Sequence, residues 1–322
     1  MRLRFFREVP NFDFFRFQWM TLGLSGVLVV LSLVAWAVIG LNFGIDFRGG
    51  TTIRTQSEQA VEVGEYRKAL NPLNLGDVSI TEVFDPTFTE DQHVAMIRIQ
   101  AQDGQESVSQ QTVAKIETAL QAVDETITFP LVESVGPKVS GELIWTAVLA
   151  VSASLAAILF YIWLRFEWQF SVGAVAALAH DVILTIGIFS VLQIRFDLAT
   201  IAALLTIIGY SINDTVVIFD RLRENLIKFK STPLRDLMNL TANETLSRTL
   251  MTSGTTLLAL IAMLILGGDV IRGFIFAITW GVIVGTYSSI YVAKNIVLML
   301  GVKRDWSKPD QNQGNQFANV DA

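Results

Sequence analysis

A single carboxylate, Asp214, interrupts the apolar run 198–219. Tyr210 and Ser211 lie four and three residues before it, so they share its helix face, and Asn213 is its chain neighbour. A charge at mid-membrane costs roughly 2.5–3.5 kcal/mol on insertion scales, which makes an intramembrane acid a functional candidate by default. Such an acid can take up and release a cation, a proton or, with nearby side-chain oxygens, Na⁺. The alternative is a structural hydrogen bond between helices, or an acid that reaches water at the inner interface.

Two further sites could serve the same chemistry. His180 and Asp181 stand in the middle of another apolar run, where a His/Asp pair could relay protons; a packing hydrogen bond or ion pair fits equally well. Helix neighbours diverge by about 100°, so each would need a partner on another helix. Arg248 precedes a later apolar run and is the nearest cation able to reach a buried carboxylate from the cytoplasmic side of the membrane. By itself, the sequence favours a simpler interpretation, in which Arg248 is one of the basic residues that mark cytoplasmic loops.

The absence of other motifs predicts that the chain is not an enzyme. It lacks the G-x-x-x-x-G-K-[ST] signature of nucleotide hydrolysis, and no Ser/His/Asp arrangement can be proposed. It has two histidines and no cysteine, which argues against a zinc site and excludes disulfides. We therefore expect no catalytic residue, no metal site and no cofactor apart from a coupling ion.

Composition indicates a membrane protein with one acidic insert. Of the 322 residues, 52% are hydrophobic and 17% charged, too few charges to cover a soluble surface of this size. Residues 42–140 contain 15 acidic and 7 basic residues, a net charge of −8, whereas the rest of the chain has a net charge of +2.

Apolar runs of about 20 residues predict six membrane spans. The expected organisation is an amino-terminal segment 1–19, spans at 20–41, 141–164, 169–192, 198–219, 249–266 and 274–300, an insert at 42–140, an amphipathic loop at 220–248 and a disordered tail at 301–322. Basic residues are concentrated in 1–19, 220–248 and the tail, so both termini are expected to be cytoplasmic and the insert external. The 220–248 loop is expected to form one or two amphipathic helices on the inner membrane surface, or a solvated linker.

The insert is long enough to fold as a domain, and we call it the head. Its pattern predicts strand, helix, strand, strand, helix, strand at 51–55, 61–70, 78–84, 93–99, 108–123 and 127–132. This order is the ferredoxin-like split βαβ. The glycine pair 49–50 and the Gly136-Pro137 pair mark the junctions with the membrane helices.

Five segments together resemble the SecF family of the RND transporter superfamily. They are GIDFRGGT at 44–51, ESVGPKVSGEL at 133–143, RFEWQFSVGAVAALAHDVILT at 165–185, IGYSINDTVVIFDRLREN at 208–225 and SRTLMTSGTT at 247–256. The resemblance implies an α-helical polytopic protein of the bacterial inner membrane, with six spans and an α+β periplasmic domain between the first two. It also implies that Asp214 is the transport carboxylate and Arg248 the functional arginine, and we keep His180, Asp181, Tyr210, Ser211 and Asn213 as a polar network around them.

The resemblance further implies a role in protein export. The proton or sodium motive force would assist late translocation through the SecYEG channel, with SecD supplying a second acid and the other half of the transporter. An unfolded preprotein would bind at the head, a YidC-type insertase is a further candidate partner, and no nucleic acid is expected. Two alternatives are an ion-driven exporter of a small molecule or lipid, and a non-transporting scaffold subunit in which Asp214 and Arg248 substitutions are silent.

Overall fold

The computed structural model describes residues 9–302 apart from 77, 87, 90 and 101–107. The described residues include six helices long and apolar enough to cross a membrane, which confirms the predicted number of spans. These are α1 (Gln18–Val38), α5 (Pro137–Arg165), α6 (Trp168–Leu192), α7 (Leu198–Lys228), α8 (Leu234–Leu266) and a composite of α9 (Asp269–Ser288), the π-helix η2 (Ser289–Ala293) and α10 (Lys294–Leu300). Residues 1–8 of the expected amino-terminal segment and residues 303–322 of the expected disordered tail lie outside the described residues.

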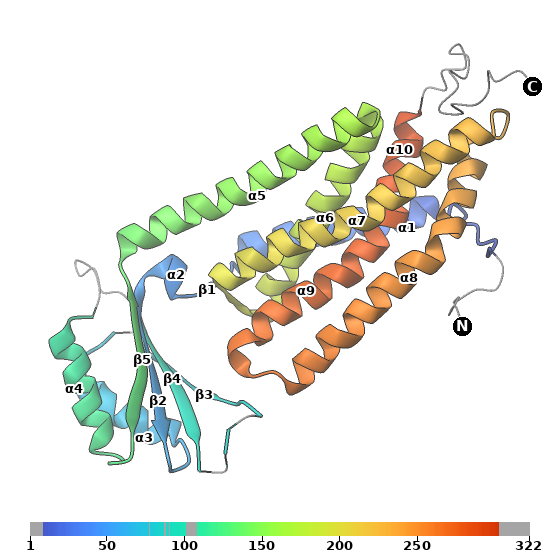
Figure 1. Ribbon diagram of the computed structural model, residues 1–322. Helices are drawn as coiled ribbons and strands as arrows, with labels where there is room; N and C mark the ends of the chain where they lie inside the picture. The colour runs from blue at the N-terminus through green and yellow to red at the C-terminus, as the bar shows by residue number, and fades with distance from the viewer. Residues whose placement is uncertain (1–8, 77, 87, 90, 101–107, 303–322) are drawn as a thin grey trace, which may run out of the picture.

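The head lies between α1 and α5 and consists of a four-stranded sheet with two helices on one face (Figure 1). Its elements are β2 (Gly50–Ser57), α3 (Val63–Leu70), the 3₁₀ turn η1 (Asn71–Leu73), β3 (Val78–Val83), β4 (His93–Gln100), α4 (Gln110–Gln121) and β5 (Thr128–Val135). The strands are ordered β3-β4-β2-β5, with every neighbouring pair antiparallel. This is the split βαβ arrangement that the sequence predicted. Its apolar layer includes the fully buried side chains of Ile53, Ile97, Ile116 and Leu120.

The junction between the head and the helix bundle is short and closely packed. After α1 the chain forms β1 (Asn42–Phe43) and the one-turn helix α2 (Ile45–Arg48) before β2 begins. Strand β1 pairs in parallel with β6 (Arg195–Phe196), which connects α6 to α7. Gly49 and Gly50 have φ values of +74° and +132°, backbone conformations that glycine adopts without a Cβ clash. The predicted glycine junction is therefore confirmed, as is the one at Gly136, which precedes the first residue of α5.

Helix α6 is the central helix of the bundle. It contacts α1, α5, α7 and α9, and its small residues Ala174 and Ala177 are completely buried. Small side chains allow membrane helices to approach closely, where packing rather than a hydrophobic driving force holds them together. Figure 1 shows the head at one end of the bundle, and the start of α1 and α10 at the other. We call these the head end and the far end.

The 220–248 segment forms two helices, one of the two arrangements expected from the sequence, and both are continuous with the neighbouring spans. Helix α7 continues to Lys228 and α8 begins at Leu234, so both spans extend beyond their apolar runs as a helical hairpin. Polar pairs hold the two extensions together: the Asn225 amide donates to Thr241 Oγ1 at 3.0 Å and to Glu244 Oε2 at 2.7 Å. The amphipathic pattern correctly indicated that one face of each extension is buried. That face packs against the neighbouring extension.

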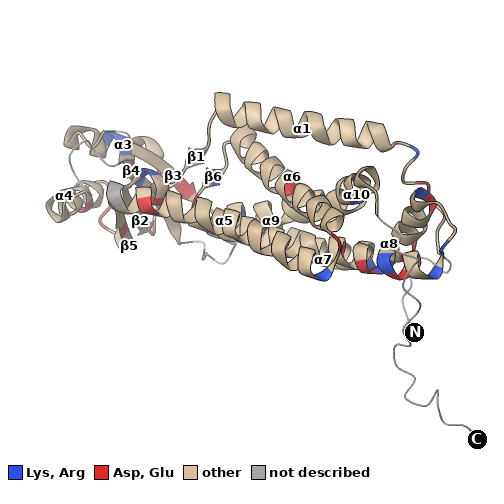
Figure 2. Cartoon of the chain, turned by 90° about the horizontal axis from the view of Figure 1, so that it is seen from above, with Lys and Arg blue, Asp and Glu red and all other residues tan. Residues whose placement is uncertain are grey.

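Charged residues occupy the ends of the bundle and the head. Figure 2 shows Lys, Arg, Asp and Glu concentrated at the far end and in the head, with almost none along the middle of the helices. This distribution suits a bundle whose centre lies in hydrocarbon, where a charge without a partner is costly. The few acidic residues in the middle of the helices are therefore exceptions to this distribution.

Candidate functional site in the membrane helices

Asp181 on α6 is completely buried and accepts three side-chain hydrogen bonds from three helices. Ser211 Oγ on α7 donates to Asp181 Oδ2 at 2.7 Å and Ser288 Oγ on α9 donates to the same oxygen at 2.8 Å. His180 Nδ1 lies 3.0 Å from Asp181 Oδ1, so the adjacent side chains meet even though they diverge around the helix. We call these four residues the intramembrane polar network. It links α6, α7 and α9.

A glycine makes room for this network. A Cβ at Gly285 on α9 would lie 3.0 Å from Ser211 Oγ and 3.5 Å from Asp181 Oδ2. One helical turn before it, a Cβ at Gly281 would lie 2.3 Å from the Ile207 side chain. The two glycines therefore let α9 approach α7 closely enough for Ser211 and Asp181 to meet.

Asp214 lies one turn beyond Ser211 on α7 and is 3% exposed. Ser253 on α8 is its polar neighbour, and the Ser253 hydroxyl pairs with Thr286 Oγ1 at 2.7 Å. Arg248 is the cation whose charge acts on Asp214. Among the ion pairs of the described residues none involves Asp214, so its separation from any cationic nitrogen exceeds 4.0 Å. Arg248 itself is exposed on α8. Asp214 is thus a buried carboxylate without a cation in direct contact.

The remaining predicted residues lie around Asp214 in different surroundings. Tyr210 is half-buried, and its hydroxyl donates to Thr256 Oγ1 on α8 at 3.2 Å. Asn213 is exposed, so the structure does not place it in the polar network. The predicted residues therefore form two groups, one centred on Asp181 and one where α7 meets α8.

Small and polar side chains form the exposed face of α7. On α7 the exposed positions recur at Ala202, Thr206, Gly209 and Asn213, whereas α8 exposes large apolar residues such as Leu258 and Ile265. Between positions 199 and 226 of α7, all of them described, no large hydrophobic side chain is exposed. By contrast α1 and α5 expose many, including Trp19, Trp36, Trp145 and Trp163. We call the α7 row the small-residue face; it suits a second set of helices better than lipid chains.

Sequence reasoning missed several polar residues of the bundle. Ser288 is a partner of Asp181, and Ser253 pairs with Thr286 beside Asp214. The signal for both was a serine in an apolar run at the depth of an acid on another helix. Lys294 is 1% exposed at the far end, with its Nζ 4.7 and 4.2 Å from the ring centroids of Phe14 and Phe15. No sequence period indicates that the segment before α1 folds back over this lysine.

A side-chain amide holds that amino-terminal segment in place. Asn243 on α8 accepts a hydrogen bond from the Phe12 backbone N–H and donates one to the Phe12 carbonyl, both at 2.8 Å. Groups of three or more His, Cys, Asp or Glu side chains able to hold a metal are absent among the described residues. The arrangement therefore offers two buried carboxylates in a helix bundle that has an α+β domain at one end, and only one of the two carboxylates is fully hydrogen-bonded. That combination defines a polytopic membrane protein with an α+β domain between its first two spans.

Comparison with known proteins identifies the family. Residues 115–303 match the family described as "Protein export membrane protein SecD/SecF, C-terminal", and residues 34–61 match the SecD/SecF GG motif. The protein translocase subunit SecF of Cereibacter sphaeroides is 64% identical over 100% of this chain and 99% of its own length; that of Vibrio alginolyticus is 40% identical over 94% and 95%. The chain belongs to the SecF family.

Solved structures share the fold over most of the chain. The crystal structure of SecDF from Thermus thermophilus, described as a translocon-associated membrane protein, matches with a TM-score of 0.79 and 38% identity over 90% of this chain. SecDF in its super-membrane-facing form matches with a TM-score of 0.69 over 93%. This chain spans 39% and 40% of those two chains. The SecDF likeness points to SecD as the partner.

Proposed function

We propose that this chain, paired with SecD, uses a proton or sodium gradient across a bacterial cytoplasmic membrane to assist late stages of protein translocation. The observation that carries the proposal is Asp214, a carboxylate that is 3% exposed in an apolar helix and has no cation within ion-pair distance among the described residues. A carboxylate in such surroundings gains more from binding a proton or Na⁺ than one in water does. Asp181 is less suited to this role because its oxygens already accept three hydrogen bonds.

Cation exchange at Asp214 would change how α7 packs. Binding a cation cancels the attraction between Asp214 and the charge of Arg248 on α8, so it favours a different arrangement of the two helices. Each elementary charge that crosses the membrane supplies roughly 2.3 kcal/mol per 100 mV of potential. The polar network would transmit the change to α6 and α9, because Ser211 lies one turn from Asp214 and bonds Asp181.

The start of α7 provides a short route to the head. Its first residue, Leu198, donates its backbone N–H to Asp46 Oδ2 on α2 at 3.0 Å. Strand β6, directly before α7, pairs with β1, which leads through α2 into β2 of the head. A shift of α7 would thus move the head, in addition to the route through α1 and α5 that the sequence suggested. A head that holds an emerging chain in one state and releases it in the other would bias movement outward.

This function requires a particular orientation and further partners. The basic residues at the far end favour that end as cytoplasmic, which places the head in the periplasm and both termini inside. The expected partners are SecD, the SecYEG channel and an unfolded preprotein at the head, with a YidC-type insertase as a further candidate. The relatives named protein translocase subunits support this assignment of process.

Ion flux into vesicles that hold the purified complex with SecD tests the proposal. Flux should be compared under a pH gradient and under a Na⁺ gradient, with and without a translocating protein. Asp214→Asn should abolish gradient-dependent flux in whichever condition the unmodified complex shows it. Asp220→Asn is the matched control, because Asp220 lies on the same helix but pairs with Arg165 at its exposed end.

Two outcomes would contradict the proposal. Unchanged flux in the Asp214→Asn complex would assign ion coupling elsewhere or indicate a scaffold. Flux that depends on a small molecule or lipid and ignores a translocating protein would favour an exporter. Equal response to both gradients in the unmodified complex would leave Asp214 as the site and show that it accepts both ions.

A further inference from the structure

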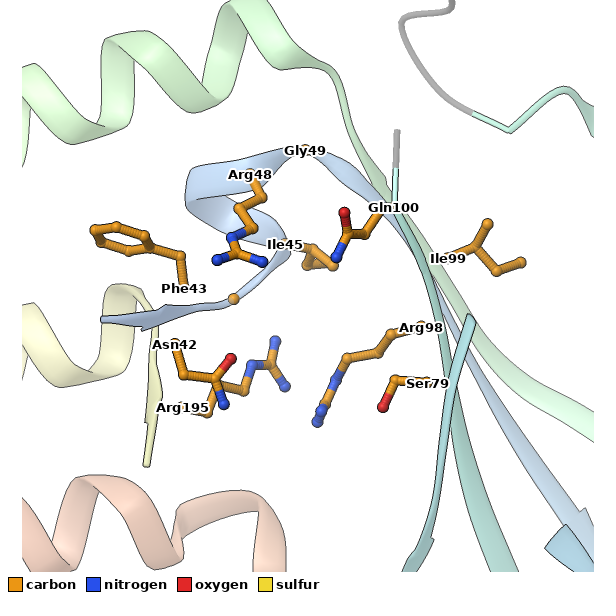
Figure 3. Close-up of a pocket in the computed structure, with 11 residues that line it drawn as sticks. Asn42, Phe43, Ile45, Arg48, Gly49, Ser79, Arg98, Ile99, Gln100 and Arg195 are labelled. Carbon is orange, nitrogen blue, oxygen red and sulfur yellow. The ribbon is translucent and has the colours of Figure 1, made fainter. Parts of the chain in front are cut away.

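A small pocket lies where the head meets the bundle, and its walls come from both parts (Figure 3). Its volume is about 140 Å³. Three of its 11 lining residues are arginines: Arg48 from α2, Arg98 from β4 and Arg195 from β6. None of the 11, all of them described, is acidic. Figure 3 shows the three guanidinium groups reaching into the same space.

The arginines have few partners in the protein. The Nε atoms of Arg98 and Arg195 are buried and have no hydrogen-bond partner among the described residues. Arg98 Nη2 donates to the weak acceptor Met96 Sδ at 3.1 Å. Arg195 Nε lies 3.8 Å from Asp197 Oδ2, too far for a hydrogen bond. The donors that face the pocket are therefore largely unused.

Positive charge at the pocket exceeds the negative charge beside it. Asp197 is the acid next to Arg195, and its Oδ1 already accepts hydrogen bonds from the N–H and hydroxyl of Thr200, both at 3.0 Å. Burial, and after it the charge of Arg195, lower the pKa of the Arg98 guanidinium to about 10, while the charge of Asp197 opposes them. Arg98 still carries its charge at neutral pH. An anion between the two would relieve their repulsion.

The fold fixes this arrangement locally. Pairing of β1 with β6 sets Asn42 opposite Arg195, and the Arg195 side chain lies against Gly44, where a Cβ would be 2.9 Å from Nε. Gly49, with its φ of +74°, turns the chain from α2 toward β2 directly after Arg48. Two glycine positions thus let three arginines from separate elements converge.

We propose that this junction pocket binds a phosphate group, with Arg98 and Arg195 as its principal donors and Arg48 as the third. Guanidinium groups match phosphate oxygens through paired N–H donors, which favours arginine over lysine in such sites. A water molecule occupies roughly 30 Å³, so a pocket of about 140 Å³ has room for a tetrahedral oxyanion but is too small for a segment of polypeptide. The ligand class is therefore a phosphate mono- or diester, or phosphate itself.

The position of the pocket favours a lipid phosphate. The pocket lies at the head end, where α1 stops at Val38, α6 stops at Leu192 and α7 starts at Leu198. The ends of spanning helices mark the level of the lipid headgroups, which border a hydrocarbon core of about 30 Å. A phosphate held there by all three arginines would tie β4 of the head to the α6–α7 connection, and would favour the head orientation seen in this structure.

Binding of defined probes to the purified full chain in detergent tests the site. The probes are a short-chain phosphatidylglycerol, a diacylglycerol of the same chain length without phosphate, and inorganic phosphate, each titrated against thermal stability and counted by native mass spectrometry. Arg98→Gln and Arg195→Gln should each weaken phosphatidylglycerol binding about tenfold, as expected for one lost charge-assisted hydrogen bond. Arg67→Gln, which removes an exposed arginine from α3 of the same head, should change it less than about twofold.

The outcomes separate the sources of phosphate. Arginine-dependent binding of phosphatidylglycerol alone supports a lipid site, and arginine-dependent binding of inorganic phosphate as well supports a site open to soluble phosphates. Arg48 is exposed, so Arg48→Gln preserves the fold and decides the question if the buried variants misfold. Equal binding by the unmodified chain and the Arg48→Gln, Arg98→Gln and Arg195→Gln variants would overturn the proposal, as would equal binding of the diacylglycerol. Ion flux of the complex is a separate readout, so failure here leaves the Asp214 proposal standing.

Discussion

At the scale of single residues, the two intramembrane acids differ in how completely their oxygens are used. Asp181 joins three helices through hydrogen bonds, whereas Asp214, one turn from the serine that reaches Asp181, has no cation in contact among the described residues. A satisfied buried carboxylate stabilises one packing, and an unsatisfied one can change its charge state at lower cost. The two acids can therefore serve fixed and switching roles within one bundle.

The serine partners of Asp181 should contribute measurably to stability. Ser211→Ala or Ser288→Ala removes one hydrogen bond to a buried carboxylate, and each should lower the free energy of unfolding by roughly 1.5–3 kcal/mol. Unfolding of the purified chain in detergent measures this loss, and pairing each change with Asp181→Asn measures the coupling. Ser171→Ala is the control, because that buried hydroxyl on α6 has no partner among the described residues. Coupling energies near zero would show that the contacts carry no stability.

Low pH should destabilise the head by protonating Asp124. Burial acts to raise the pKa of Asp124, but hydrogen bonds from Ser57 and Thr126 outweigh it and hold the pKa below its ordinary value. The stabilisation is present above the unfolded-state pKa near ~3.9 and is lost as pH falls through the lower folded-state pKa. Amide protection in β2 and β5 should therefore fall below about pH 4 in the full chain, after correction for intrinsic exchange. Asp124→Asn should flatten this dependence and Glu125→Gln, an exposed neighbour, should leave it intact.

At the scale of helices and strands, periodicity predicted the type and bounds of each element better than the contacts between elements. Every head strand was placed to within a few residues, because alternating apolar positions and glycine junctions are local signals. The α7–α8 hairpin was assigned to the membrane surface because an amphipathic pattern shows that a helix has an apolar face. The pattern does not show whether lipid or another helix packs against that face. The contacts of Asp181 with Ser211 and Ser288 could not be predicted for the same reason: they join residues 30 and 107 positions apart.

Close approach of α9 to α7 depends on glycine at position 281. In Gly281→Ala the added Cβ meets Ile207, whose β-branched side chain has little freedom to move, so overpacking should cost about 1–3 kcal/mol. Gly26→Ala on α1 is the control, since nothing lies within 4 Å of its Cβ position. That change should be neutral or stabilising by up to about 1 kcal/mol through helix propensity. Thermal unfolding compares the two, and equal effects would mean that α9 can retreat without loss.

At the scale of the whole molecule, the chain has the features of one half of a larger assembly. It spans 39% of the Thermus thermophilus SecDF chain that it resembles. Its small-residue face leaves α7, the helix that carries Asp214, without the large apolar side chains that are exposed elsewhere on the bundle. Under the proposed function, a partner that packs on this face would complete the ion path beside the buried acid.

Blocking the small-residue face should prevent assembly while leaving this chain folded. Gly209 lies at the middle of the α7 row with nothing within 4 Å of its Cβ position, so Gly209→Leu fits the isolated chain but places a large side chain between α7 and a partner helix. Co-purification with SecD should fall at least about tenfold, which corresponds to a loss of about 1.4 kcal/mol. Gly26→Leu makes the same change on the lipid-exposed face of α1 and should leave co-purification intact. Retention of SecD by the Gly209→Leu chain would place the partner on another face, and Asp214 would then have to exchange its ion within this chain alone.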